Sequence, residues 1–242
     1  MKKLYYHVNE EIKYRDGDTM NENEKALVGE KAAETFVKDG MTVGLGTGST
    51  VYYAILKIGE MVRKGISVQG VATSKGTEEL AKQQGITLLN IDDIEKIDVA
   101  IDGADEIDRN FFAIKGGGGA LFREKVIANA ADQFIVVADS SKVVDTLGSF
   151  PLPVEVVPFG AKVTERSLQK LGCTTNIRKK DNEIYVTDNG NYIIDCSFKT
   201  ILDPEQLEKD LNKIVGVVEN GLFLHMVNHV VTITNENEIT IL

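Results

Sequence analysis

A glycine-rich turn between a short apolar segment and an amphipathic one constrains the fold of this chain most. Residues 41–45 are mostly apolar, residues 44–50 read GLGTGST, and apolar residues then recur every three or four positions from Val51 to Val62. A short apolar run that ends in glycines predicts a buried strand, and the longer spacing predicts a helix. The turn therefore predicts a strand–turn–helix unit.

The same alternation continues through the first 150 residues. Further strands are predicted at 66–72, 86–89, 97–101 and 134–138, and further helices at 21–38, 77–84 and about 120–131. Strands that alternate with helices predict an α/β fold, in which a parallel sheet carries helices on both faces.

The pattern changes near Phe150, where Pro151 and Pro153 mark an expected boundary. The segments that follow are a strand at 154–157, a helix at 161–171, three short β-runs around Thr174, Tyr185 and Ile193, and a helix from Pro204 to about Ile214. The order β-α-β-β-α-β predicts a small α+β domain of ferredoxin-like type. The tail, at 230–234 and 238–242, is β again and could return to the first domain. The expected division is an N-terminal extension at 1–20, a main domain at 21–150 plus about 220–242, and a small domain at about 151–219.

Composition excludes several classes of protein. The net charge of −10 argues against non-specific binding to nucleic acid or to an anionic membrane. The first 19 residues hold three lysines but no apolar core of a signal peptide, and no stretch approaches the roughly 20 apolar residues of a membrane span. Cys173 and Cys196 fit a reduced, cytoplasmic setting as small core residues. His225 and His229 could share one face of a helix, but no third ligand lies nearby, so no metal site is expected.

The GLGTGST turn differs from the common nucleotide-binding turns. A dinucleotide fingerprint has a third glycine where Ser49 stands and an acidic residue after the second strand, and a phosphate-binding loop of nucleotide hydrolases has a lysine. Backbone amides at the start of the helix, with the hydroxyls of Thr47, Ser49 and Thr50, suit a terminal phosphate instead. Ser49 and Thr50 are also expected to cap the helix, and a purely structural tight turn explains the loop equally well.

Three further segments place chemistry at the carboxyl ends of strands. Asp102 and Asp105 follow one strand, Lys115 precedes the four glycines 116–119, and Glu124 lies one turn beyond them. Four consecutive glycines favour a main chain that comes close to a ligand. Lys142 ends ADSSK at 138–142, after the next strand, and is a candidate phosphate partner. Taken singly, each of these groups fits a solvated surface or a turn; together they predict one anion-binding cleft.

With these segments in order, the chain resembles ribose-5-phosphate isomerase, type A, over roughly residues 21 to 242. The resemblance rests on GLGTGST at 44–50, DGADEID at 102–108, KGGGGALFREK at 115–125, ADSSK at 138–142 and LGSFPLPVEVVP at 147–158, with VTDNGNYIID at 186–195 and LDPEQLE at 202–208 as further similarities. It implies a Rossmann-like main domain with an inserted α+β domain, a homodimer or homotetramer, and neither metal nor organic cofactor. It also implies a small phosphorylated sugar as substrate, interconverted between D-ribose 5-phosphate and D-ribulose 5-phosphate in the pentose phosphate pathway.

The resemblance also assigns site residues. It implies Glu124 as the catalytic glutamate, Lys142 as a phosphate contact and Lys25 as a further lysine near the phosphate. The implied substrate contacts are Thr47, Gly48, Ser49 and Thr50; Asp102, Gly103, Ala104 and Asp105; and Lys115, Gly116, Gly117 and Gly118. The sequence departs from the family in its N-terminal arm and in Gly119, where an alanine can occur.

The chemistry that we expect is proton transfer between C1 and C2 of the sugar. Glu124 would act as the base, and Lys115 with the amides of the glycine loop would stabilise the enediolate oxygen. Asp102 and Asp105 would orient the sugar hydroxyls. Two other readings stay open: a CoA-transferase, in which a glutamate after a glycine loop attacks a thioester, and a sugar-phosphate-sensing module of a regulator. The phosphate turn disfavours the first, and the acidic net charge disfavours the second.

Overall fold

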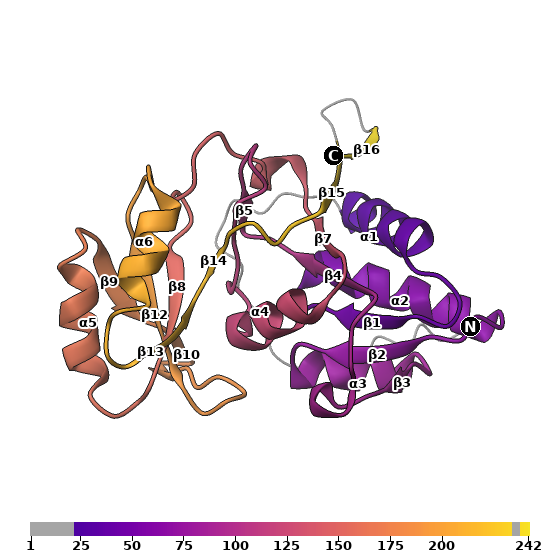
Figure 1. Cartoon of the computed structure of the whole chain (residues 1–242), viewed down its shortest axis with the longest axis horizontal. Coiled ribbons are helices and arrows are strands. Elements are labelled where there is room, and N and C mark those ends of the chain that lie inside the picture. The colour runs from indigo at the N-terminus through magenta and orange to yellow at the C-terminus, as the bar shows by residue number, and fades with distance from the viewer. Residues whose placement is uncertain (1–21, 234–237) are drawn as a thin grey trace.

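A computed structural model describes residues 22–233 and 238–242, so the proposed N-terminal extension lies outside the described residues. Its larger part is a seven-stranded sheet in the order β16-β15-β7-β4-β1-β2-β3 (Figure 1). The six strands from β15 to β3 are parallel, and β16 pairs antiparallel at one edge. These strands are β1 Thr42–Leu45, β2 Gln69–Ala72, β3 Thr87–Leu88, β4 Val99–Gly103, β7 Phe134–Val137, β15 His229–Ile233 and β16 Ile239–Ile241.

Helices cover both faces of this sheet because its strands are apolar on both sides. Val43 and Leu45 face the core formed with α1 and α2, whereas Ala100 and Val136 face the core formed with α4. The helical elements of this part are α1 Glu22–Phe36, α2 Ser49–Arg63, α3 Lys75–Gln83, α4 Leu121–Ala130 and the short 3-10 turns η1 Ile91–Asp93 and η2 Ser140–Lys142. The predicted parallel α/β arrangement is confirmed.

A four-stranded antiparallel sheet in the order β13-β8-β12-β9 forms the second part, on the left of Figure 1, with α5 and α6 beside it. Its elements are β8 Leu152–Val156, α5 Ala161–Gln169, β9 Thr174–Ile177, β12 Tyr192–Ser197, α6 Pro204–Leu211 and β13 Val217–Asn220. Along the chain, a two-stranded ribbon of β10 Lys179–Lys180 and β11 Glu183–Ile184 comes between β9 and β12. This succession is the predicted ferredoxin-like one. The chain then returns to the large sheet as β15, as anticipated for the tail, although Thr234 lies outside the described residues. The exact division of the chain into two domains stays a proposal.

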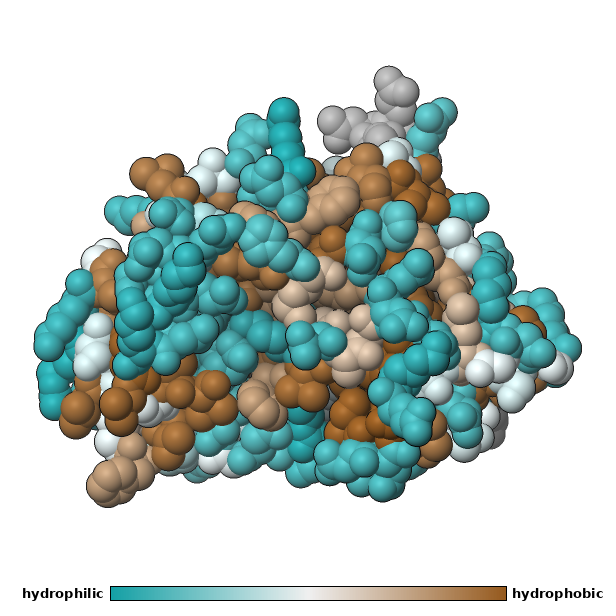
Figure 2. All heavy atoms as spheres, in the orientation of Figure 1, coloured by the Kyte–Doolittle hydropathy of each residue, from teal (hydrophilic) through white to brown (hydrophobic). Residues whose placement is uncertain are grey.

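A third sheet connects the two parts and was not predicted. It has the order β14-β6-β5, with β5 Glu106–Ile107, β6 Ala113–Ile114 and β14 Leu222–Phe223. Its strands are two residues long, too short to give a periodic signal. In the view of Figure 2, hydrophilic side chains cover much of the surface around α6, whereas weakly to strongly hydrophobic residues are visible in the middle.

Pro153 lies inside a strand that begins two residues before the expected start at Val154. Strand β8 begins at Leu152, and Pro153 pairs with Asp195 of β12 while its carbonyl accepts a hydrogen bond of 2.8 Å from the Gly221 amide. A proline lacks only the donor, so it is tolerated near the start of a strand, where its acceptor can still be used.

Candidate active site

The topology places a crevice where β1 and β4 lie side by side. The chain runs outward from β1 to β2 and β3, and then returns to β4 on the other side of β1. The loops after β1 and β4 therefore leave in opposite directions, which opens a crevice at the carboxyl ends of the strands. The turn 44–50 follows β1, and Asp102 is the fourth residue of β4.

Gly46 and Asp102 are in direct contact across this crevice. A side chain at position 46 would place its Cβ atom 2.2 Å from Asp102 Oδ1, so only glycine fits. The same oxygen accepts hydrogen bonds from the backbone amides of Thr47, at 3.1 Å, and Gly103, at 2.7 Å. The second glycine of the turn is thus required by the position of the aspartate.

Lys115 joins Asp102 to Glu124 in a cluster closed to solvent. Its ammonium lies 3.0 Å from Asp102 Oδ2 and 3.3 Å from Glu124 Oε2, and it donates a hydrogen bond to the Gly103 carbonyl. Side-chain exposure is only 2–3% for all three residues. Both carboxylate oxygens that face Lys115 are buried and have no further hydrogen-bond partner. Two carboxylates therefore share one cation, which leaves them able to accept protons.

Burial shifts the pKa values of this cluster. It raises the pKa of Glu124 to about 8, with Lys115 opposing the shift and the nearby charges of Asp102 and Asp105 adding to it. Burial also raises the pKa of Asp102, against the pull of Lys115. For Lys115, burial favours the neutral amine, but Asp102 and Glu124 outweigh it, so its pKa is raised and it stays an ammonium. The cluster consequently combines a permanent cation with a carboxylate that titrates near neutrality.

The glycine loop 116–119 lies against Asp105. The amide of Gly117 donates a 2.7 Å hydrogen bond to Asp105 Oδ2, and a Cβ at Gly117 would lie 2.4 Å from Asp105 Oδ1. Gly116 and Gly119 have positive φ values of 100° and 87°. Gly118 is exposed, and a Cβ built on it would be 3.5 Å from the Thr47 side chain. This loop therefore meets the turn after β1, which the sequence places about 70 residues away.

The start of α2 differs from its expected form. Ser49 and Thr50 were expected to cap the helix, but they are its first two residues; Gly48 is the N-cap residue, with φ 124°, and no side chain caps the helix. A capping side chain satisfies amides of the first turn. Without one, the first amides of α2 and the positive end of its dipole are available to an anion beside Thr47.

Three hydroxyl groups surround the Thr47 side chain and escaped the sequence analysis. Thr47 Oγ1 lies 2.7 Å from Thr73 Oγ1, 2.9 Å from Ser74 Oγ and 3.1 Å from Thr77 Oγ1. Thr77 also donates to the Gly46 carbonyl. These contacts hold the turn in place, and the only signal for them was the polar end of the second strand, Thr73-Ser74.

The two predicted phosphate lysines come from different elements, η2 and α1. Lys142 ends η2 after β7, and its charge helps to lower the pKa of Asp105, although burial raises that pKa on balance. Lys25 lies one helical turn before Gly29 on α1, and a Cβ at Gly29 would touch the Thr50 carbonyl at 2.6 Å. Lys25 therefore lies on the flank nearest the start of α2. Ala104, the remaining predicted contact, follows β4 and packs at the edge of the core beneath α4.

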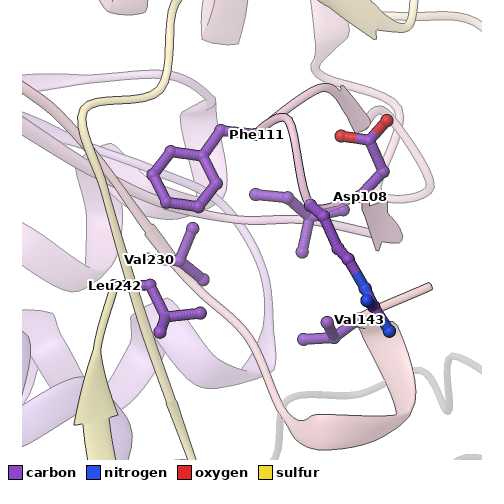
Figure 3. Close-up of a pocket in the computed structure, with 7 residues that line it drawn as sticks. Asp108, Phe111, Val143, Val230 and Leu242 are labelled. Carbon is purple, nitrogen blue, oxygen red and sulfur yellow. The ribbon is translucent and has the colours of Figure 1, made fainter. Parts of the chain in front are cut away.

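Two other regions carry none of the predicted substrate contacts. A mostly apolar cavity of about 250 Å³ lies among Ile107, Arg109, Val143, Val230 and their neighbours (Figure 3). His225 and His229 do not share a helix: His225 follows β14 and pairs with Glu205, whereas His229 opens β15 against Phe36. Within residues 22–233 and 238–242, no group of three or more His, Cys, Asp or Glu side chains could hold a metal ion. No helix in that part of the chain is long and apolar enough to cross a membrane.

Comparison with known proteins identifies relatives over most of the chain. The family model described as ribose 5-phosphate isomerase A (phosphoriboisomerase A) matches residues 69–237. A ribose-5-phosphate isomerase A from Bacillus mycoides is 54% identical over 205 residues, which cover 84% of this chain and 92% of the relative. Its namesake from Listeria monocytogenes is 52% identical over 91% of this chain and 98% of its own length. The structure of ribose 5-phosphate isomerase from Plasmodium falciparum superposes with a TM-score of 0.89 at 37% identity, covering 92% of this chain and 98% of that one.

Proposed function

Because the chain belongs to the ribose 5-phosphate isomerase A family, we propose that it interconverts D-ribose 5-phosphate and D-ribulose 5-phosphate through an enediolate, with Glu124 as the base. The observation that carries this proposal is the buried cluster of Glu124, Lys115 and Asp102 at the carboxyl ends of β1 and β4. A carboxylate that moves a proton must lie beside a group that stabilises the adjoining oxygen. Glu124 and Lys115 meet this requirement at 3.3 Å.

The proton moves in two steps. Glu124 removes the proton from C2 of the aldose while Lys115 and the amides of the glycine loop stabilise the negative charge that develops on O1. The protonated Glu124 then returns the proton to C1, while the O2 hydroxyl gives up its proton and O1 gains one, so that C2=O forms and the ketose results. Asp102 and Asp105 orient the sugar hydroxyls and take part in their proton exchanges. The phosphate binds to the turn 47–50, with Lys142 and Lys25 on its flanks, so that its binding energy positions the reacting carbons.

Purified protein incubated with ribose 5-phosphate tests this proposal directly. Formation of ribulose 5-phosphate, with the same equilibrium ratio reached from either sugar, is the expected result. A protein that forms no ribulose 5-phosphate but transfers CoA between acids, or one that binds the sugar without converting it, would contradict the proposal. Treatment with a chelator is expected to leave the activity unchanged.

The pH dependence of kcat/KM follows from the raised pKa of Glu124. The base must be ionised, and its folded-state pKa is about 8, so the free enzyme loses its active form as the pH falls through 8. We expect kcat/KM to fall about tenfold per pH unit well below that value. Initial rates between pH 6 and 9.5 measure it. A profile that stays flat down to pH 6 would show that the titrating carboxylate is not the base.

Lys142 supplies a separate test of the phosphate site. Replacement by alanine is expected to raise KM for ribose 5-phosphate, since an ion pair to the phosphate is lost far from the reacting carbons, and to change kcat less. Steady-state kinetics separate the two constants. Lys162→Ala, which removes an exposed lysine paired with Glu165 on α5, is the matched control. An unchanged KM in Lys142→Ala would place the phosphate elsewhere.

The assembly and location of the enzyme form a further part of this proposal. The resemblance implies a homodimer or homotetramer with a small phosphorylated sugar as its ligand. The two cysteines favour the cytoplasm, and the net charge of −10 argues against nucleic acid or an anionic membrane as a partner. Light scattering coupled to size-exclusion chromatography measures the mass of the assembly. The mass of a single chain, 26.5 kDa, would contradict the expectation.

A further inference from the structure

The glycine loop 116–119 is held from outside by Arg178, which directly follows β9 of the four-stranded sheet. Arg178 lies between β9 and β10, and its Nη1 donates hydrogen bonds to the carbonyls of Gly116, at 2.9 Å, and Gly117, at 3.0 Å. These carbonyls belong to a loop that contacts Asp105 on its other side. No sequence motif singled out Arg178, since its contacts lie about 60 residues away along the chain.

The two carbonyls fix the direction of two amides. In a planar trans peptide, the N–H of the next residue points away from the carbonyl oxygen. When Arg178 holds the Gly116 carbonyl, the Gly117 amide therefore faces the opposite side, where it meets Asp105 Oδ2 at 2.7 Å. By the same geometry, the Gly117 carbonyl turns the Gly118 amide away from Arg178.

Arg178 is itself fixed by a carboxylate. Its Nε and Nη2 form a two-pronged pair with Asp195 of β12, and the Nε contact measures 3.1 Å. The side chain is only 16% exposed. A guanidinium held by two bonds on one edge keeps its remaining nitrogen in a defined place, which an ammonium cannot do. The Asp195–Arg178 unit is thus a rigid support rather than a mobile surface charge.

The loop requires such a support. Two of its glycines have positive φ, and four successive glycines have more conformational freedom to lose than any other residues. Amides stabilise a developing oxyanion only when they are aimed before the reaction begins. Tyr185, which follows β11, covers the Gly119 end of the loop, because a Cβ at Gly119 would lie 2.3 Å from the Tyr185 hydroxyl.

We propose that Arg178, braced by Asp195, is a positioning residue that keeps the Gly117 amide on Asp105 and turns the Gly118 amide toward the active site. The inference rests on the proposed isomerase reaction for its kinetic consequence, but the order of the loop can be measured without it. The part of the molecule built on the four-stranded sheet thereby contributes to catalysis. It does so through a residue that contacts the main chain of the site rather than the sugar.

Arg123 provides a matched control for this proposal. It also joins the two parts of the molecule, through bonds of 2.9 Å to the Asn189 side chain and 3.3 Å to the Asp188 carbonyl, but no contact found for it involves the glycine loop. Arg123→Ala therefore weakens the same junction without freeing the carbonyls of Gly116 and Gly117. Arg178→Lys keeps the charge but cannot span both Asp195 and the loop.

The experiment compares kinetics, rescue and loop exchange in these variants. Arg178→Ala is expected to lower kcat about 10- to 100-fold with a smaller change in KM, because the amides act on the transition state. Asp195→Asn and Arg178→Lys should show part of this loss. In Arg123→Ala, kcat should fall less than about threefold. Guanidinium at about 50 mM, far below unfolding concentrations, should restore part of the activity of Arg178→Ala alone. Hydrogen–deuterium exchange should be faster in the peptide that carries residues 116–119 of Arg178→Ala.

Two results would overturn the proposal. One is an Arg178→Ala variant with wild-type kcat and wild-type exchange in the loop. The other is an equal loss of kcat in Arg123→Ala, which would mean that both arginines only hold the sheets together. An inactive wild-type protein would count against the isomerase function instead, and the exchange measurement would then decide the role of Arg178.

Discussion

Glu124→Gln is expected to lower kcat at least about 10²-fold, with little change in KM for ribose 5-phosphate. Glutamine keeps the shape of the side chain and can still accept a hydrogen bond from Lys115, but it cannot take the C2 proton. The sugar binds through its phosphate and hydroxyls, which this change leaves in place. Steady-state kinetics with both sugars measure the effect, and near-normal turnover would remove Glu124 from the role of base.

The same variant is expected to be more stable than the wild type at high pH. Burial raises the folded-state pKa of Glu124 to about 8, above its unfolded value near 4.5. For a raised pKa, the stabilising contribution is complete below the unfolded value and is lost as the pH rises through the folded value. Above pH 8 the wild type therefore holds a buried carboxylate that glutamine avoids, and we expect a gain of roughly 1–3 kcal/mol.

Thermal unfolding at pH 9 and pH 5 tests this expectation. A higher Tm of Glu124→Gln at pH 9, with the difference reduced at pH 5, supports the buried titrating carboxylate. A variant that is less stable than the wild type at both values would show that the carboxylate contributes net stability, and would contradict the electrostatic account of the cluster. This test does not depend on enzymatic activity.

Lys115→Met is expected to have the second large effect, on both activity and stability. Methionine fills much of the space but leaves Asp102 and Glu124 buried without their cation, and breaking a buried ion pair in this way costs about 3–5 kcal/mol. Separately, the loss of a donor that stabilises the oxyanion is expected to lower kcat about 10²- to 10³-fold. Chemical unfolding and kinetics of the variant measure the two effects separately.

A double variant distinguishes these two causes. Above pH 8, where Glu124 is ionised in the wild type, Lys115→Met combined with Glu124→Gln removes one of the unpaired carboxylates, so it is expected to regain part of the lost stability while staying inactive. Were the double variant as unstable as Lys115→Met, the loss would come from packing around the lysine stem, which lies against the Phe223 ring, and not from unpaired charge.

Much of the main sheet could be predicted because its signals are local. The buried strands are short apolar runs, and α2 and α3 end just before glycines with positive φ, Gly65 and Gly85. Two of the predicted site segments could be placed because they lie at the carboxyl ends of β1 and β4, which are neighbours in the main sheet, whereas Lys115 follows β6 of the connecting sheet. Gly46 shows the physical reason for one glycine of the turn: Asp102 occupies the space that a side chain would need.

The parts that could not be predicted depend on contacts between distant segments. Arg178 reaches the glycine loop from another sheet, and nothing in its neighbourhood marks it. The strands of the connecting sheet are two residues long, so pairing rather than pattern creates them. His225 and His229 have helical spacing, but His225 has a positive φ of 57° in a turn after β14. At Ser49 and Thr50, a plausible capping pattern was wrong because Gly48 takes the N-cap position.

The central claim, that the Glu124 carboxylate carries the proton between the two carbons, is tested most directly with ribose 5-phosphate deuterated at C2. Nuclear magnetic resonance follows whether the label leaves C2 and reaches C1 or water. In the wild type we expect the label to leave at the rate of isomerisation, and in Glu124→Gln at about 1% of that rate or less. Loss of the label from C2 at the wild-type rate in Glu124→Gln would contradict the claim.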